Sequence, residues 1–266
     1  MKCLRILVFA IFIFVLSVSG LAAQSLKGMS LNGSTGLYSI PSGKIGWEKS
    51  SDLGFDLGYH TIITQKTATH IPKFALSLFK WVELSAAFDI QPEGYYHSNA
   101  SDFIGGMKVQ FPLKKTALAL GGNFQALNIG SEDYNRHAGQ VYLAVTYNGS
   151  LFDLPAETTV VIGKTFVQHD IDSDIDFGMG FDILLFPKAF ESLLHWVTDF
   201  ANFSYSVEAF GANARYRGVL NTGLRFDLAS IPALSKFKFV IDIMVADAFD
   251  DNRAFSMGLV FGIPIL

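Results

Sequence analysis

The sequence predicts an all-β fold, namely an antiparallel transmembrane β-barrel of about 12 strands with a short periplasmic helix. Half of the residues are hydrophobic and only 17% are charged, which is below the roughly 25% usual in soluble domains. The apolar residues recur at every second position along most of the chain, and this period indicates strands. Many of these segments reach the roughly 9–11 residues that a tilted strand needs to cross a bilayer.

Residues 1–23 have the features of a secretory signal peptide. Lys2 and Arg5 precede an apolar run from Ile6 to Val18, and the small residues around Ala23 suit cleavage before Gln24. The run is shorter than the roughly 20 residues of a membrane-spanning helix, which favours cleavage over an uncleaved anchor. We therefore expect export to the cell outer membrane of a diderm bacterium.

The exported part of the chain has an acidic charge balance and no cysteine. Loss of Lys2 and Arg5 leaves 18 basic residues against 24 acidic ones, a net charge of −6. The only cysteine, Cys3, lies in the signal, so disulfides and thiolate metal sites are excluded from the exported part. The chain has no basic run, and we expect no nucleic-acid partner.

The next segment, residues 24–50, is rich in Gly and Ser. Its stretch from Asn32 to Gly43, NGSTGLYSIPSG, resembles the G-x-T-G-L-x-x-x-P-[ST]-[AG] opening of YjbH-like outer-membrane proteins. The resemblance covers only the front of the chain and implies envelope location and barrel architecture. Pro41 favours an extended backbone there. We expect this segment either to plug the lumen or to lie below it.

Residues 51–266 are predicted to form the barrel itself. In the segment from Asp52 to Thr61, for example, Leu53, Phe55 and Leu57 share one face and the aspartates and glycines share the other. We place the strands at 52–62, 73–79, 82–90, 102–112, 116–128, 138–147, 157–168, 174–186, 202–211, 216–228, 236–247 and 254–265. The last strand ends the chain with aromatic residues, as expected of a strand that the barrel-insertion machinery recognises.

The connections alternate in character. Residues 79–81 and 113–115 are predicted to be tight periplasmic turns. Residues 148–156 and 187–201 are longer links on the same side, and the apolar residues of the second have helical spacing. That link is predicted to be an amphipathic helix, which either lies at the membrane surface or caps the barrel end.

Alternation alone does not separate a membrane barrel from a soluble sandwich. Strand length, glycines opposite the apolar face and mid-strand charges favour a barrel whose apolar face meets lipid. The candidate lumen-facing charges are Asp56, Asp89, Lys108, Lys164, Asp176, Asp182, Glu208, Arg225, Asp227 and Asp242. We expect Lys164 to pair with Asp176 or Asp182, and Arg225 to pair with Glu208 or Asp242.

The sequence motifs that would indicate catalysis or metal binding are weak. No two histidines have the spacing of a zinc motif, and the one local candidate for hydrolysis, His169-Asp170, is more typical of a solvated pair. Asp170, Asp172, Asp174 and Asp176 alternate in a run that suits a solvated strand end better than a cation site, although an acidic rim favours cations in a pore. We predict no catalytic, cofactor-binding or metal-binding residue.

The function predicted from these features is a narrow outer-membrane channel or small-solute transporter, with the lipid bilayer as its surroundings. Twelve strands lie between filled eight-stranded barrels and open sixteen-stranded porins. The alternative is a structural or adhesive surface barrel without a pore. An outer-membrane hydrolase is the least supported reading, and we predict that the protein is not an enzyme.

Overall fold

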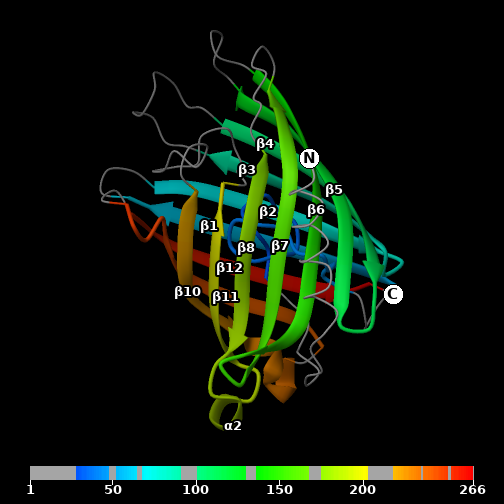
Figure 1. Cartoon of the computed structure of the whole chain (residues 1–266), viewed down its shortest axis with the longest axis vertical. Coiled ribbons are helices and arrows are strands. Elements are labelled where there is room, and N and C mark those ends of the chain that lie inside the picture. The colour runs from blue at the N-terminus through cyan, green and yellow to red at the C-terminus, as the bar shows by residue number, and fades with distance from the viewer. Residues whose placement is uncertain are drawn as a thin grey trace, which may run out of the picture.

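Twelve antiparallel strands close into a barrel in the computed structural model (Figure 1). The structure describes residues 28–47, 52–64, 68–90, 101–129, 136–167, 175–202, 218–234, 236–250 and 253–265. The strands are β1 (Leu53–Ile63), β2 (Ala68–Leu78), β3 (Val82–Ile90), β4 (Ser101–Pro112), β5 (Thr116–Ile129), β6 (Arg136–Leu151), β7 (Leu154–Val167), β8 (Asp176–Leu184), β9 (Leu194–Ala201), β10 (Val219–Asp227), β11 (Lys238–Ala246) and β12 (Ala254–Pro264). The predicted fold class and strand number are confirmed.

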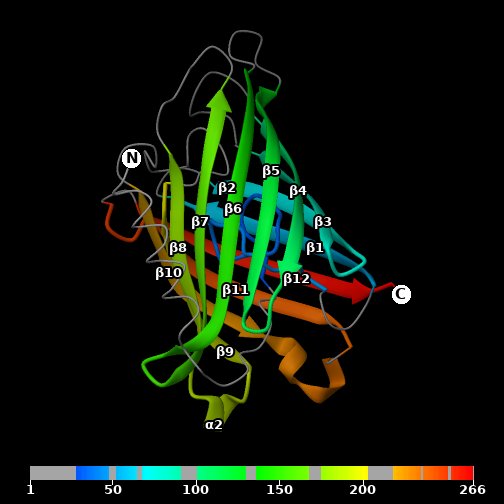
Figure 2. The same cartoon turned by 45° about the vertical axis from the view of Figure 1, so that its right-hand side comes forward.

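Each strand pairs with its neighbours in sequence, and the first and last strands close the sheet. β1 pairs with β12 from Gly54 opposite Pro264 to Ile63 opposite Phe255. Closure leaves no open sheet edge, which is the condition for a β-structure to span a bilayer. The blue-to-red order of the strands around the barrel can be followed in Figures 1 and 2.

The two faces of the wall have opposite chemistry. Large apolar side chains on the outer face are exposed, including Leu57 at 54%, Val141 at 54% and Phe166 at 60%. On the inner face, by contrast, every second residue of β11 from Lys238 to Ala246 is buried. A soluble sandwich would bury its apolar face, so this exposed belt identifies the lipid-facing side of a membrane barrel.

Tight turns join β2 to β3, β4 to β5 and β6 to β7 at one end of the barrel, here called the short-turn end. Phe79 and Lys80 have positive φ, and so do Phe152 and Asp153, as the central residues of type I′ turns require. The predicted link at 148–156 is therefore wrong, because β6 and β7 run on to a two-residue turn. The opposite end, here called the long-loop end, carries the connections that fall mostly outside the described residues.

The short helix predicted within the link at 187–201 is present, but it is a single turn. Helix α2 covers only Pro187–Phe190, and the rest of the link leads into β9. The backbone of β9 pairs with β8 and β10, so hydrogen bonding between strands prevails over the helical spacing of its apolar residues. The strand predicted at 202–211 lies outside the described residues except for Asn202. Short 3-10 helices, η1 (Leu228–Ser230) and η2 (Pro232–Leu234), precede β11.

Among the described residues, no helix has the length and apolar character needed to cross a membrane.

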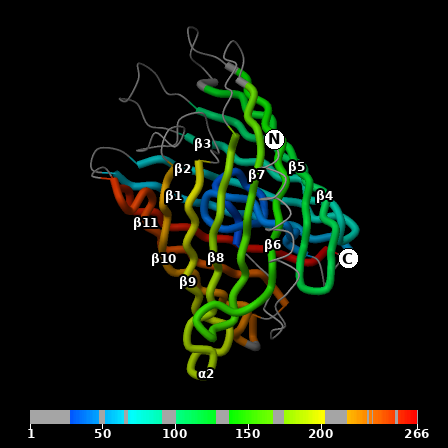
Figure 3. Tube along the Cα trace, viewed as in Figure 1, coloured from blue at the N-terminus to red at the C-terminus, as the bar shows by residue number. Residues whose placement is uncertain are grey.

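The segment 28–47 lies within the ring of strands, where Figures 1 and 3 show it in blue. All but one of its residues are buried, Gly46 being partly exposed. We call this segment the plug. Its β-bridges join its own residues, Met29 with Thr35 and Gly36 with Pro41, so it folds on itself inside the barrel.

Candidate functional site: the plugged lumen

The inner face of the wall is polar and charged. Alternation along each strand places one residue in two on this face, and many of these side chains are ionisable. The buried charged residues of the strands are Asp56, Lys73, Glu83, Asp89, Asp102, Lys108, Glu157, Asp182, Asp199, Arg225, Asp227, Lys238 and Asp242. Burial of so many charges is costly unless they are paired and hydrogen-bonded, and the plug supplies many of the partners.

Glu83 of β3 is an anchor for the plug near the short-turn end. Its carboxylate accepts hydrogen bonds from the Thr35 backbone N–H at 2.8 Å, the Thr35 hydroxyl at 2.6 Å and the Gly46 N–H at 3.0 Å. Lys108, opposite Glu83 on β4, lies 3.1 Å from the carboxylate and donates to the Thr35 carbonyl at 2.8 Å. One buried ion pair therefore binds the backbone of two turns of the plug.

Asp199 of β9 is the second anchor. It accepts from the backbone N–H groups of Tyr38 at 2.9 Å and Ser39 at 2.8 Å, and from the Ser39 hydroxyl at 2.8 Å. Asn221 of β10 donates to the same carboxylate at 2.8 Å. Hydrogen bonds from two successive N–H groups to a buried carboxylate fix the backbone at the tip of this plug turn.

Arg225 of β10 links three strands to the plug. Its guanidinium donates to both oxygens of Asp242, at 2.7 and 3.1 Å, and to Asp182 at 3.3 Å. It also donates to the Gly36 carbonyl at 3.3 Å. The Nδ1 atom of His195, on β9, lies 2.5 Å from the Asp182 carboxylate. The predicted pairing of Arg225 with Asp242 is present, and its fork geometry suits a carboxylate.

Three further points of contact hold the plug. Lys73 of β2 donates to the Met29 and Ser30 carbonyls at 2.9 and 2.8 Å. Lys44, the only charged residue in the plug, reaches the wall at Glu157.

The contact between Lys44 and Glu157 is close. The Lys44 ammonium lies 2.7 Å from the Glu157 carboxylate of β7 and 2.7 Å from the Asn148 side-chain oxygen of β6. At the third point, Asp56 accepts from the Trp47 indole at 2.8 Å and from Lys238 at 2.6 Å. The plug thus binds the wall along its length through hydrogen bonds with ionisable side chains.

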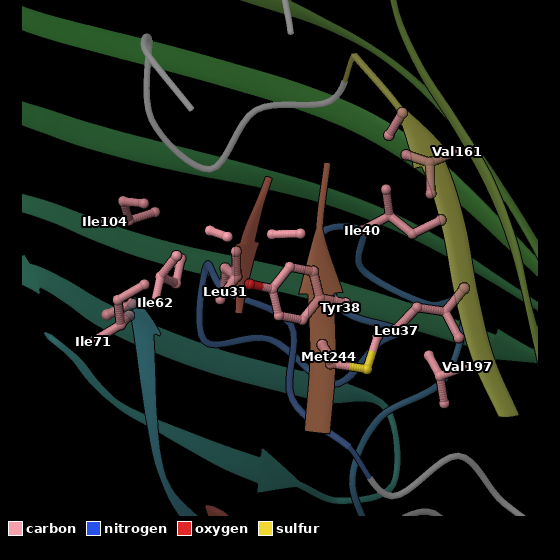
Figure 4. Close-up of a cluster of buried hydrophobic side chains, with 14 of the residues drawn as sticks. Leu31, Leu37, Tyr38, Ile40, Ile62, Ile71, Ile104, Val161, Val197 and Met244 are labelled. Carbon is pink, nitrogen blue, oxygen red and sulfur yellow. The ribbon is translucent and has the colours of Figure 1, made fainter. Parts of the chain in front are cut away.

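An apolar cluster supplements these polar contacts. Leu31, Leu37, Tyr38 and Ile40 of the plug pack with apolar side chains of several strands, as the close-up in Figure 4 shows. The wall residues labelled there are Ile62, Ile71, Ile104, Val161, Val197 and Met244. Burial of these side chains supplies the hydrophobic part of plug docking.

Glycines allow the closest approaches of plug to wall. Gly33 has φ of +88°, and a Cβ there would lie 2.5 Å from the Ala86 carbonyl oxygen. A Cβ on Gly43 would lie 2.2 Å from the Ala117 carbonyl oxygen. Both glycines belong to the motif from Asn32 to Gly43, so the backbone path of the motif fits this wall only without side chains at these positions.

The structure places most of the predicted charges on the inner face. Asp56, Asp89, Lys108, Asp182, Arg225, Asp227 and Asp242 are buried there, and Asp176 accepts a hydrogen bond from Thr165 of β7 at 2.6 Å. The prediction for Lys164 is wrong, because Lys164 is two residues from the exposed Ile162 and Phe166 in β7 and therefore shares their outer face. Asp182 binds Arg225 and His195, not Lys164 as one of the predicted pairings had it.

Several predicted residues lie outside the described part of the chain. These are Glu208, His169, Asp170, Asp172 and Asp174. Among the described residues, no group of three or more His, Cys, Asp or Glu side chains is arranged to hold a metal ion.

The plug anchors Glu83, Glu157 and Asp199 were absent from the predicted set. Glu83 has the same parity as Asp89 in a correctly predicted strand, so alternation alone was enough to place it inside. Asp199 lay in the link that was predicted to be helical. Glu157 begins the strand predicted at 157–168, where taking Lys164 as inward placed Glu157 on the opposite, outer face.

Comparison with known proteins supports the architecture. No family model and no curated protein matches the sequence. Among solved structures, the KdgM porin in complex with disordered oligogalacturonate is similar with a TM-score of 0.50 at 5% identity, over 79% of this chain and 99% of that one. The outer-membrane protein Omp33 of Acinetobacter baumannii has a TM-score of 0.45 at 12% identity, over 82% and 100% of the two chains.

The chain therefore has the fold of an outer-membrane β-barrel. This fold and the exposed apolar belt imply a lipid bilayer around the wall. At such low identity the likeness concerns architecture, and the function has to be argued from the lumen.

Proposed function

We propose that the protein is an outer-membrane channel for small solutes that its own plug, residues 28–47, holds closed. One observation carries the proposal, which is that the wall is complete without the plug. Every strand of the closed barrel pairs with two other strands, and the plug's bridges are internal to it. Removal of the plug would leave the barrel's hydrogen-bonded ladder intact.

The chemistry of the inner face supports a water-filled lumen as the open state. A wall lined by Glu83, Lys108, Asp199 and Arg225 is compatible with water, whereas an apolar interior would be suited to permanent packing. When the plug leaves, water can replace its hydrogen bonds to these side chains. Twelve strands also give a barrel wider than the eight-stranded barrels that side chains fill.

The proposal includes the protein's route to the membrane. Cleavage after Ala23 would place the plug close to the new N-terminus, and the C-terminal strand β12 would present the insertion signal. The YjbH-like resemblance of the plug motif belongs to the same proposal, since it concerns the residues that dock in the lumen. A hydrolytic function forms no part of it.

Planar-bilayer recording tests the proposal. Refolded protein with the plug is expected to be closed for most of the recording, and protein lacking residues 28–47 is expected to show stable unitary steps. Heat-modifiable migration on a gel must first show that both forms are folded barrels. If the deleted barrel is folded and inserted but gives no steps, the channel proposal is wrong and a structural barrel is favoured.

A further inference from the structure

We infer that the open lumen prefers cations and that the point where Lys44 docks is a binding site for a permeating ammonium group. This inference rests on the proposed channel function. Two observations carry it independently: the charge balance of the buried wall, and the way in which the plug occupies it.

The buried charges of the strands are mostly negative. Nine are acids, Asp56, Glu83, Asp89, Asp102, Glu157, Asp182, Asp199, Asp227 and Asp242, and four are bases, Lys73, Lys108, Arg225 and Lys238. A narrow passage lined by one sign of charge concentrates the field in its interior. Rings of Asp and Glu are the usual basis of cation preference in pores.

The plug shows what this wall binds. Towards Glu83 and Asp199 it presents only N–H and O–H donors, from Thr35, Gly46, Tyr38 and Ser39. The wall's carboxylates are thus already matched to donor groups of a resident occupant. A solute rich in N–H donors or positive charge makes the same contacts, whereas an anionic solute meets like charge.

Lys44 identifies a specific position within this field. Its ammonium lies between a carboxylate oxygen of Glu157 and the side-chain oxygen of Asn148, each at 2.7 Å. Its side chain is 4% exposed and that of Glu157 is 5% exposed. When the plug leaves, Lys44 leaves with it, and the two oxygens remain in place on neighbouring strands of the wall, where a primary ammonium ion can take the same contacts.

Reversal potentials measured across a KCl gradient test the preference on the barrel lacking residues 28–47. We expect the sign of a cation-selective pore, and added methylammonium chloride is expected to reduce the K⁺ current by occupying the Glu157 position. The Glu157→Gln variant is expected to shift the reversal potential toward zero and to lose the methylammonium effect. The Glu191→Gln variant, which makes the same change at an exposed residue of the β8–β9 link, is expected to change neither.

The outcomes separate this inference from the proposed function. A folded barrel without unitary steps contradicts the channel, and cation preference with it. Unitary steps with anion preference, or with none, leave the channel standing and overturn the inference. Equal effects of Glu157→Gln and Glu191→Gln would overturn the assignment of the ammonium site.

Discussion

The wall and the plug are held by different interactions. In the wall, backbone hydrogen bonds join every strand to its neighbours, as in the long ladder between β6 and β7. In the plug, backbone hydrogen bonds such as Leu31 N–H to the Tyr38 carbonyl are internal, and contacts with the wall involve side chains such as Glu83 and Asp199. The wall is thus a scaffold, and the plug is a ligand that belongs to the same chain.

The largest expected effect comes from removing an anchor of the plug. Glu83→Gln takes the charge partner from Lys108 and the ionised acceptor from Thr35 and Gly46. Loss of one partner of a buried pair costs about 3–5 kcal/mol, and we expect most of this cost to fall on plug docking. The loss of docking free energy is measured by denaturant titration, in which the labelling of a cysteine that replaces Ile40, in a chain with Cys3→Ser, reports undocking of the plug.

The barrel wall is expected to stay folded in the Glu83→Gln variant. Heat-modifiable migration of Glu83→Gln is expected to match that of the unmodified protein. If the variant loses both the protection of the cysteine at Ile40 from labelling and the heat-modifiable migration of the folded barrel, plug and wall are one cooperative unit.

The lipid-facing belt gives the next largest effect, on the wall and not on the plug. Leu57 lies near the middle of β1 and is 54% exposed. Arginine at mid-bilayer on the lipid face costs about 2–4 kcal/mol, and about 0–1 kcal/mol near the interfaces. We expect Leu57→Arg to lower the free energy of unfolding of the barrel in lipid vesicles by the larger amount.

Leu113→Arg is the matched control, since Leu113 is 64% exposed in a tight link at the short-turn end. Equal costs at Leu57 and Leu113 would contradict the position of the membrane along the wall.

A single added methyl group tests the fit between plug and wall. Gly33→Ala brings a Cβ to within 2.5 Å of the Ala86 carbonyl at a φ of +88°. Backbone strain of this kind costs about 1–3 kcal/mol, which corresponds to an increase of about fivefold to 140-fold in the undocked fraction. The rate of labelling of a cysteine at Ile40 reports this fraction.

Gly139→Ala is the control for the same change on the wall, because a Cβ there meets no heavy atom within 4 Å. We expect Gly139→Ala to leave the labelling rate unchanged. Equal labelling rates in the two variants would mean that Gly33 does not set the close approach.

The smallest effect is expected at an exposed ion pair. Lys80 and Asp52 lie 3.1 Å apart, with side chains 43% and 70% exposed. Pairs of this kind contribute about 0–1 kcal/mol, so Asp52→Asn should leave both plug protection and barrel stability almost unchanged. A cost as large as that of Glu83→Gln would show that burial is not what distinguishes the anchors.

The wall could be predicted from sequence because alternation is a local signal. It correctly placed Asp56, Arg225 and Asp242 on the inner face. It failed for Lys164, where charge was taken as evidence of an inward side chain although Lys164 lies two residues from Ile162 and shares its outer face.

The errors in the fold have similar local causes. The turn at Phe152-Asp153 contains no glycine or asparagine, so its sequence carries little of the usual hairpin signal. In β9, the apolar residues fit both helical and strand spacing, and only pairing with β8 and β10 decides between them. The contacts of the plug, such as Tyr38 and Ser39 with Asp199, join residues far apart in sequence and depend on how the closed barrel surrounds the segment.

The central claim is that the plug closes a lumen whose wall stands without it, and a reversible tether tests it most directly. A Cβ built at Gly178 lies 3.6 Å from the Cβ of Ile40, within the about 3.5–4.5 Å of a disulfide. Ile40→Cys with Gly178→Cys, in a chain with Cys3→Ser, therefore joins the plug to β8. Conductance is recorded in urea at a concentration that leaves the barrel folded. We predict no unitary steps while the disulfide is intact and unitary steps after reduction, whereas identical conductance in the two states would contradict the account.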